Sequence, residues 1–195
     1  MVTMAGITRR QFNVAEYHRM AEVGILCEDD RVELLDGEIW QMSPIGSRHA
    51  ACVDRLNRLL SRRAEDDTIV RVQSPIQLDD YSEPQPDLAL LRMQPDFYAE
   101  ALPTAGDVLL MIEVADTSLE YDRRLKLPRY AQAGIPEVWL VDLNEHSVRV
   151  YTQPFEDGYR VIQQLHPGQS VSATRIAGLA VAVNDMLGEQ QDSGE

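Results

Sequence analysis

Apolar residues recur along this chain with two periodicities, one typical of helices and the other of strands. Asn13 and Glu16 have the spacing of a helix capping box, and apolar residues around them recur on one helical face. The pair Asp36-Gly37 joins two short runs of strand-forming residues and predicts a tight β-hairpin. The run Val108–Ile112 is apolar at every position, as in a strand that is covered on both faces. We predict helices at about 14–23, 47–64, 121–133 and 183–187, and strands at about 31–35, 38–42, 68–73, 86–91, 107–114, 137–142, 147–152 and 159–165.

This order of elements predicts the fold class. Helix, hairpin, helix, strands, helix and strands follow one another, which favours an α/β (α+β) fold with a central mixed β-sheet flanked by helices. The 195 residues fit one domain with a sizeable core. We therefore predict a single domain over 1–195, with its core at 12–187 and short polar tails at both ends.

Composition narrows the class of protein. The chain is 44% hydrophobic and 26% charged, which is typical of globular proteins. The first residues contain no apolar signal-peptide region, and the longest apolar run is too short to cross a bilayer. We expect a cytoplasmic protein with no membrane contact. For Cys27 and Cys52 a single disulfide stays possible, but two buried thiols are favoured.

The charge of the chain further limits how it could bind nucleic acid. The formal net charge of −14 argues against indiscriminate coating of nucleic acid, although a local basic stripe can still dock phosphates. Of the 18 basic residues all but one are arginine, and the exception is Lys126. This single lysine is either the chance remainder of a compositional bias or a position that requires a compact ammonium group.

Two carboxylates stand at positions that are unfavourable for charge. Asp87 follows Pro86 at the start of an apolar strand, and Glu113 interrupts the apolar strand 107–114. An ionised carboxylate in a buried strand costs several kcal/mol unless it is paired or bound to a metal. Taken singly, Asp87 could cap a turn and Glu113 could pair with an arginine. Together on two strands they favour a hard-oxygen site for Mg²⁺, with Mn²⁺ as a substitute, and close like charges that Asp87→Asn would relieve.

Lys126 is the third element of this hypothesis. On the predicted helix, Asp122, Lys126 and Tyr130 are spaced at i, i+4 and i+8 and so share one face. A lysine that faces the carboxylates could stabilise an attacking hydroxide or the developing charge on a phosphate. The alternative is an exposed ion pair between Asp122 and Lys126, worth a few tenths of a kcal/mol.

The same positions carry a resemblance to a known family. The chain resembles the Uma family of predicted restriction endonucleases over about 12–187, in the segments and residues Glu33–Ile39, His49, Pro86-Asp87, Glu113-Val114, Asp122, Lys126, Tyr130, Gly134 and Glu137–Asp142. The resemblance implies a restriction-endonuclease-like fold and a metal-dependent nuclease site of the PD-(D/E)xK type. In that pattern the lysine follows the acid by two residues, where this chain has Ala115. The family supplies the lysine from the following helix, a position that Lys126 matches.

The resemblance also implies supporting residues. It makes Glu33 an accessory acid beside the metal, and it makes Asp122 and Tyr130 accessory to the site. His49 would contact phosphate or assist proton transfer, although a structural histidine is an equal alternative. Gln73 resembles a polar group at the edge of the site. His18, His146 and His166 have no partners at metal-ligand spacing and are predicted to be surface residues.

One basic patch stands out. Arg48, Arg55 and Arg62 recur every seven residues on the predicted helix 47–64. They are the candidates for contacts with DNA phosphates, with a solvated helix face as the alternative.

The leading hypothesis is therefore a Mg²⁺-dependent DNA endonuclease. Its metal ligands are Asp87 and Glu113, its electrostatic catalyst is Lys126, and it needs no organic cofactor. Because the cutting of both DNA strands needs two sites, we expect a homodimer. The alternative hypothesis is a non-catalytic module of the same fold that binds nucleic acid or another protein.

Overall fold

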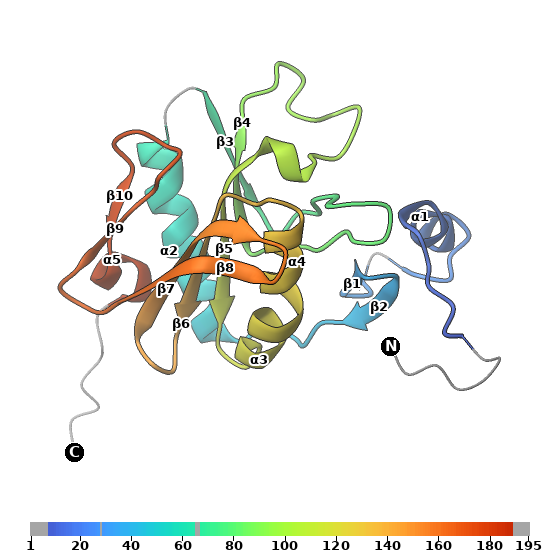
Figure 1. Cartoon of the computed structure of the whole chain (residues 1–195), viewed down its shortest axis with the longest axis horizontal. Coiled ribbons are helices and arrows are strands. Elements are labelled where there is room, and N and C mark those ends of the chain that lie inside the picture. Colours follow the sequence, from blue (N-terminus) through green and yellow to red (C-terminus); the bar gives the residue numbers. More distant parts are fainter. Residues whose placement is uncertain (1–7, 28, 65–66, 189–195) are drawn as a thin grey trace.

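A computed structural model of the chain describes residues 8–27, 29–64 and 67–188 (Figure 1). At its centre is one six-stranded sheet with the strand order β3-β4-β5-β6-β7-β8. The pair β5/β6 is parallel and the other neighbours are antiparallel, so the predicted mixed sheet is confirmed. The strands are β3 (Thr68–Val72), β4 (Leu88–Arg92), β5 (Val108–Ala115), β6 (Glu137–Asp142), β7 (Ser147–Phe155) and β8 (Gly158–Leu165).

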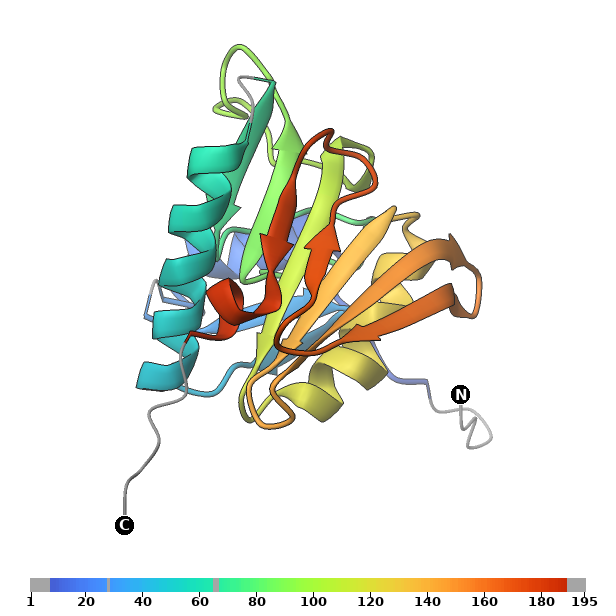
Figure 2. The ribbon, with the colours of Figure 1, turned by 90° about the vertical axis from the view of Figure 1, so that its left-hand side faces the viewer.

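Both faces of the sheet are covered, as the apolar strands require. Helix α2 (Ser47–Arg63), the hairpin of β9 (Ser170–Ser172) and β10 (Ala180–Ala182), and helix α5 (Val183–Leu187) cover one face (Figure 2). Helix α4 (Leu127–Gln132) covers the other face.

Alternation along β5 decides which face receives Glu113. Ile112 and Val114 pack in the core on the α2 side, whereas Met111 and Ala115 pack in the core on the α4 side. Since successive side chains of a strand point to opposite faces, Glu113 points toward α4. Glu113 therefore lies on the side from which the helical connection between β5 and β6 approaches.

The first elements of the chain pack together beside this sheet (Figure 1). They are helix α1 (Val14–Glu22) and the hairpin of β1 (Val32–Leu35) and β2 (Glu38–Gln41). The predicted capping box between Asn13 and Glu16 is present. Gly37 in the hairpin turn has φ +73°, and a Cβ there would lie 2.5 Å from the Cβ of Gln11. The turn therefore needs glycine for its backbone and for its space.

The connection between β5 and β6 differs most from the prediction of a regular helix over 121–133. It begins with α3 (Leu119–Tyr121), continues as the π-helical turn η2 (Asp122–Lys126) and ends as α4. In η2 the N–H of Leu127 donates to the carbonyl of Asp122, five residues earlier. Pro128 explains the change of pitch, because proline has no N–H for the carbonyl four residues before it and crowds that carbonyl.

The other differences between the predicted and the observed elements are smaller. Asp87 precedes β4 instead of starting it, and the 3₁₀ turn η1 (Ala105–Asp107) includes Asp107, which was predicted to begin the next strand. Strands β9 and β10 were not predicted, because three residues are too few to show a period.

The cysteine prediction is correct for only one residue. Cys27 and Cys52 are both free; Cys52 is buried as predicted, and Cys27 is exposed. None of the helices within the described residues combines the length and the apolar character that crossing a membrane requires.

Candidate metal and phosphodiester site

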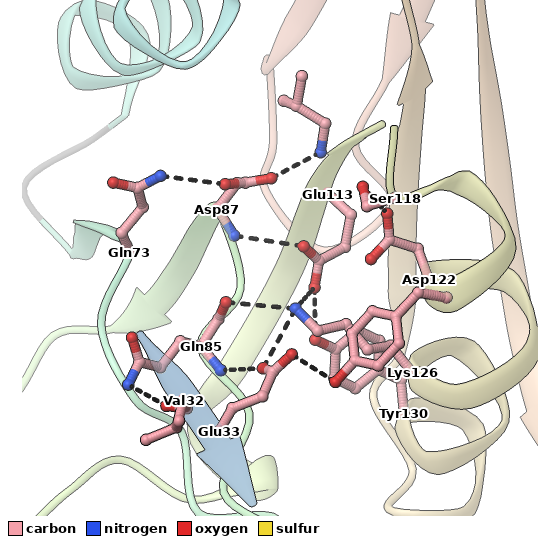
Figure 3. Close-up of polar contacts among 12 residues, drawn as sticks. Val32, Glu33, Gln73, Gln85, Asp87, Glu113, Ser118, Asp122, Lys126 and Tyr130 are labelled. Carbon is pink, nitrogen blue, oxygen red and sulfur yellow. Dashed lines mark hydrogen bonds and ion pairs between the residues drawn. The ribbon is translucent and has the colours of Figure 1, made fainter. Parts of the chain in front are cut away.

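Asp87 and Glu113 meet, as the sequence predicted. The register of β4 and β5 pairs Leu88 with Ile112, so the next residues along, Asp87 and Glu113, are opposite each other. The backbone N–H of Asp87 donates to Glu113 Oε2 over 3.4 Å, and the N–H of Val114 donates to Asp87 Oδ2 over 2.9 Å (Figure 3). These reciprocal bonds hold the two carboxylates side by side, just before the start of β4 and near the end of β5.

Lys126 reaches the same place from η2. Its Nζ lies 3.1 Å from Glu113 Oε1 and 3.3 Å from Glu33 Oε2, and it donates to the carbonyl of Gln85 over 3.3 Å (Figure 3). The hydroxyl of Tyr130 donates to the same Glu113 Oε1 over 2.5 Å. The predicted common face of Asp122, Lys126 and Tyr130 is confirmed, because all three are buried against the site.

The alternative of an exposed Asp122–Lys126 pair does not hold. Each residue is only 3% exposed. Asp122 accepts a hydrogen bond of 2.7 Å from Ser118, and Lys126 is directed at Glu113 and Glu33. The lysine is therefore part of the acidic cluster and not of the surface.

Glu33 is completely buried in β1. Its Oε2 accepts from the N–H of Gln85 over 2.8 Å and faces Lys126, while its Oε1 accepts from the hydroxyl of Tyr121 over 2.7 Å. With these partners Glu33 fixes the position of the lysine. The hairpin thus contributes a charge to a site that is otherwise built on the central sheet.

His49 and Gln73 both contact Asp87. His49 Nε2 lies 3.0 Å from Asp87 Oδ2, and Gln73 Nε2 donates to Asp87 Oδ1 over 3.3 Å. Gln73 adopts φ +46°, a left-handed conformation that is uncommon for a residue with a side chain. The second ring nitrogen of His49 is buried and has no hydrogen-bond partner within the described residues.

Burial and neighbouring charges shift the pKa values of these groups. Burial raises the pKa of Glu113 well above its ordinary value and outweighs the opposing charge of Lys126. Burial also raises the pKa of Asp87, but the bonds from His49 and from the N–H of Val114 reverse this and leave that pKa below its ordinary value. For Lys126, burial lowers the pKa, but Glu113 and the other acids raise it well above its usual range, so the ammonium is retained.

These directions change one expectation from the sequence. Because the charge of Asp87 is stabilised where it lies, Asp87→Asn is no longer expected to stabilise the metal-free protein. The unfavourable charge is that of Glu113.

The site opens into a pocket of about 350 Å³. Asp87, Glu113 and Lys126 line it together with residues of the hairpin, the β2–α2 connection and the start of the β5–β6 connection, among them Trp40, Ile45 and Tyr121. The buried cluster is thus accessible from the pocket.

The three arginines proposed for DNA lie along α2 in different surroundings. Arg48 pairs with Asp116 over 3.1 Å and donates to the carbonyl of Leu143. Arg55 donates to the carbonyls of Met186 and Leu187 at the end of α5. Arg62 is exposed. Phosphate contact stays a prediction for all three, and Arg55 has a structural role that the sequence did not indicate.

Comparisons with known proteins give the family of the chain and a protein of similar fold. A model of the Uma2 family, described as "Putative restriction endonuclease", matches residues 14–184. The chain belongs to the Uma2 family. Its fold is similar to the crystal structure of a "putative nuclease belonging to DUF820" from Anabaena variabilis, with a TM-score of 0.65 at 18% identity over 85% of this chain and 95% of that one. Among curated proteins, none matches the chain.

Four residues of this Uma2 site were missed by sequence reasoning: Trp40, Gln85, Ser118 and Tyr121. Gln85 contributes mainly backbone atoms, which carry no signal in the sequence. Trp40 could have been found, because the turn at Asp36-Gly37 fixes the hairpin register and places Trp40 opposite Glu33.

Proposed function

We propose that this chain is a metal-dependent nuclease that hydrolyses phosphodiester bonds of DNA. Its site is of the PD-(D/E)xK type, with the lysine supplied by the helical connection after the acidic strand. The observation that carries the proposal is the buried ammonium of Lys126, 3.1 Å from Glu113 and on the wall of the pocket that Asp87 also lines. Membership in a family described as restriction endonucleases supports it.

The donor set fits Mg²⁺ or Mn²⁺. Within the described residues, the sole hydrogen bonds to Glu113 Oε2 and Asp87 Oδ1 are long, at 3.4 and 3.3 Å. Both oxygens are therefore weakly engaged. No group of three or more His, Cys, Asp or Glu side chains in that part of the chain is arranged to hold a metal. Mg²⁺ suits such a site, because it is commonly bound by one or two carboxylates and completes its shell with water and substrate phosphate.

Charge supports the same ion. Glu33, Glu113 and Asp122 are buried around the single ammonium of Lys126, and Asp87 is close by. A divalent cation held by Asp87 and Glu113 would offset this negative excess, polarise a phosphoryl oxygen and lower the pKa of a water.

The remaining roles belong to the chain's own residues. Hydrolysis joins the water oxygen to phosphorus, releases a proton, and breaks the bond to the sugar oxygen, which takes up a proton. Lys126 would stabilise the hydroxide or the charge that develops on phosphate. Glu33 and Tyr130 would position Lys126 and Glu113, while His49 and Gln73 would hold the Asp87 carboxylate.

Cleavage assays test this function. The purified chain should cut plasmid or single-stranded circular DNA with Mg²⁺ or Mn²⁺ and should not cut either in EDTA. Asp87→Asn should abolish cutting, whereas Glu83→Gln, a buried acid that pairs with His18 away from the pocket, should keep it. Folded protein that cuts neither DNA with either metal would favour the non-catalytic alternative. The predicted homodimer would supply one site for each strand of a duplex.

A further inference from the structure

An aromatic wall leads from the buried lysine into the pocket. Trp40 is the cross-strand partner of Glu33 in the β1/β2 hairpin, so the two side chains share one face. The indole of Trp40 lies 5.7 Å from the ring of Tyr121, measured between centroids. Lys126 Nζ in turn lies 5.9 Å from the Tyr121 ring centroid. Trp40 and Tyr121 thus form a continuous surface that ends at the site.

Trp40 is not buried in the hydrophobic core. It is partly exposed and lines the pocket, whereas Trp139, the other tryptophan of the chain, is completely buried. The β2–α2 connection adds Met42, Pro44 and the 41% exposed Ile45 to the same lining. A partly exposed aromatic beside apolar groups offers a stacking surface to a flat ring, and a nucleobase has such a ring.

The size of the pocket limits that partner. A volume of about 350 Å³ is at the small end of the range for small-molecule sites. It can enclose one nucleotide but not a double helix, in which the bases are stacked and paired inside. Only a nucleotide that is out of the stack can place its base there.

The charge of the pocket lining also favours an unpaired nucleotide over a duplex. Five acids line the pocket, Glu33, Asp87, Glu113, Asp116 and Asp122, against the cations Lys126 and Arg31 and the imidazole of His49. A duplex carries one phosphate charge per about 1.7 Å of its axis, and a single strand about half that density. This excess of acids in the lining therefore repels a duplex more than a single strand.

We propose that this pocket takes one unpaired nucleotide of DNA, with its base stacked on Trp40, and that the substrate is single-stranded or locally unpaired DNA. The proposal names the substrate class of the proposed nuclease and rests on that function for cleavage. The binding step stands on the pocket alone. Arg31, fixed by a 2.7 Å bond to the carbonyl of Ser43, is the pocket cation outside the buried cluster that faces the phosphate backbone.

Tryptophan fluorescence tests the binding step directly. The chain has two tryptophans, and Trp139 is buried with its N–H bonded to Glu137. A short single-stranded oligodeoxynucleotide, titrated in EDTA so that it stays intact, should quench emission saturably through Trp40. The same strand annealed to its complement should bind at least about tenfold more weakly.

Variants separate stacking from folding. By anisotropy of the labelled strand, Trp40→Ala should bind about tenfold more weakly or worse, and Trp40→Phe should bind like the parent while losing the quenching. Phe155→Ala removes an exposed aromatic outside the pocket and should change neither readout. Melting temperatures within a few degrees of the parent establish that each variant folds.

The outcomes distinguish the two proposals. Equal or tighter binding of the duplex, or an unchanged affinity of folded Trp40→Ala, would overturn the unpaired-nucleotide inference even if plasmid is cut. Binding of the single strand that depends on Trp40, without cleavage in Mg²⁺ or Mn²⁺, would support the inference and count against the nuclease.

Discussion

Lys126 Nζ and Glu113 Oε1 lie 3.1 Å apart, and the two side chains are only 4% and 3% exposed. A pair this deeply buried is weak evidence for stability, because the loss of hydration offsets much of the attraction. Its value is in the placement of a compact cation beside a carboxylate that also faces Asp87.

Mg²⁺ or Mn²⁺ should raise the melting temperature. At a hundredfold excess over Kd, one site that binds only the folded state adds about 2.7 kcal/mol, or roughly 5–10 °C for a chain of this size. Differential scanning calorimetry with and without metal measures the gain. Asp87→Asn and Glu113→Gln should remove most of it, and Glu83→Gln should retain it. Equal gains in the parent and the three variants would show that the metal binds at another site.

Lys126→Arg should fold and bind metal but cut DNA poorly. Guanidinium is broad and delocalised and cannot reproduce a compact ammonium between Glu113 and Glu33. A lost transition-state contact of about 3 kcal/mol lowers the rate by about two orders of magnitude. Single-turnover cleavage at saturating metal measures this.

Arg63→Lys, a cation exchange at the far end of α2, is the matched control and should leave the rate unchanged. Cleavage by Lys126→Arg within about threefold of the parent would remove lysine from the catalytic set.

The arginines of α2 should separate into two classes. Arg55→Gln should lower stability, because it leaves the carbonyls of Met186 and Leu187 without a charged donor. Arg48→Gln and Arg62→Gln should each lower the slope of log affinity against log salt by about one if they contact phosphate. Denaturant unfolding and DNA binding at several salt concentrations measure the two effects. An unchanged slope would assign Arg48 and Arg62 to a solvated face.

Stability of the metal-free protein should fall between about pH 4 and pH 6. Burial raises the pKa of Asp122 from 3.8 to about 6, against the opposing effects of Lys126 and Ser118. The folded chain thus keeps a proton that the unfolded chain has released, so stability is lost as the pH rises through this window. Asp122→Asn should remove the share of this loss that is due to Asp122 and gain at most about 3 kcal/mol above pH 6, whereas the loss due to the raised pKa of Glu113 should remain.

Urea unfolding of both proteins in EDTA across this range tests the sign. Ser118→Ala should move the window to higher pH, because it removes a hydrogen bond that favours the charged form of Asp122. A difference between parent and Asp122→Asn that is constant with pH would contradict the assignment.

The sequence by itself determined most of the elements and identified the main acids. The capping box at Asn13, the turn at Asp36-Gly37 and the apolar run around Glu113 are local signals, and these three elements formed where their signals lie. The single-domain organisation, the cytoplasmic location and the homodimer stay predictions.

Only the tertiary structure decided which distant groups complete the site. Periodicity states the face that a residue occupies but not the segment that packs against it. Glu33 reaches Lys126 across 93 positions of the chain because the hairpin docks beside the β5–β6 connection, and the Gln85 carbonyl joins them through backbone geometry alone. The hydrogen bond from Arg55 to the carbonyl of Leu187 in α5 was likewise decided by packing. Such contacts depend on three-dimensional packing, in which burial and hydrogen bonding of unrelated segments are satisfied together.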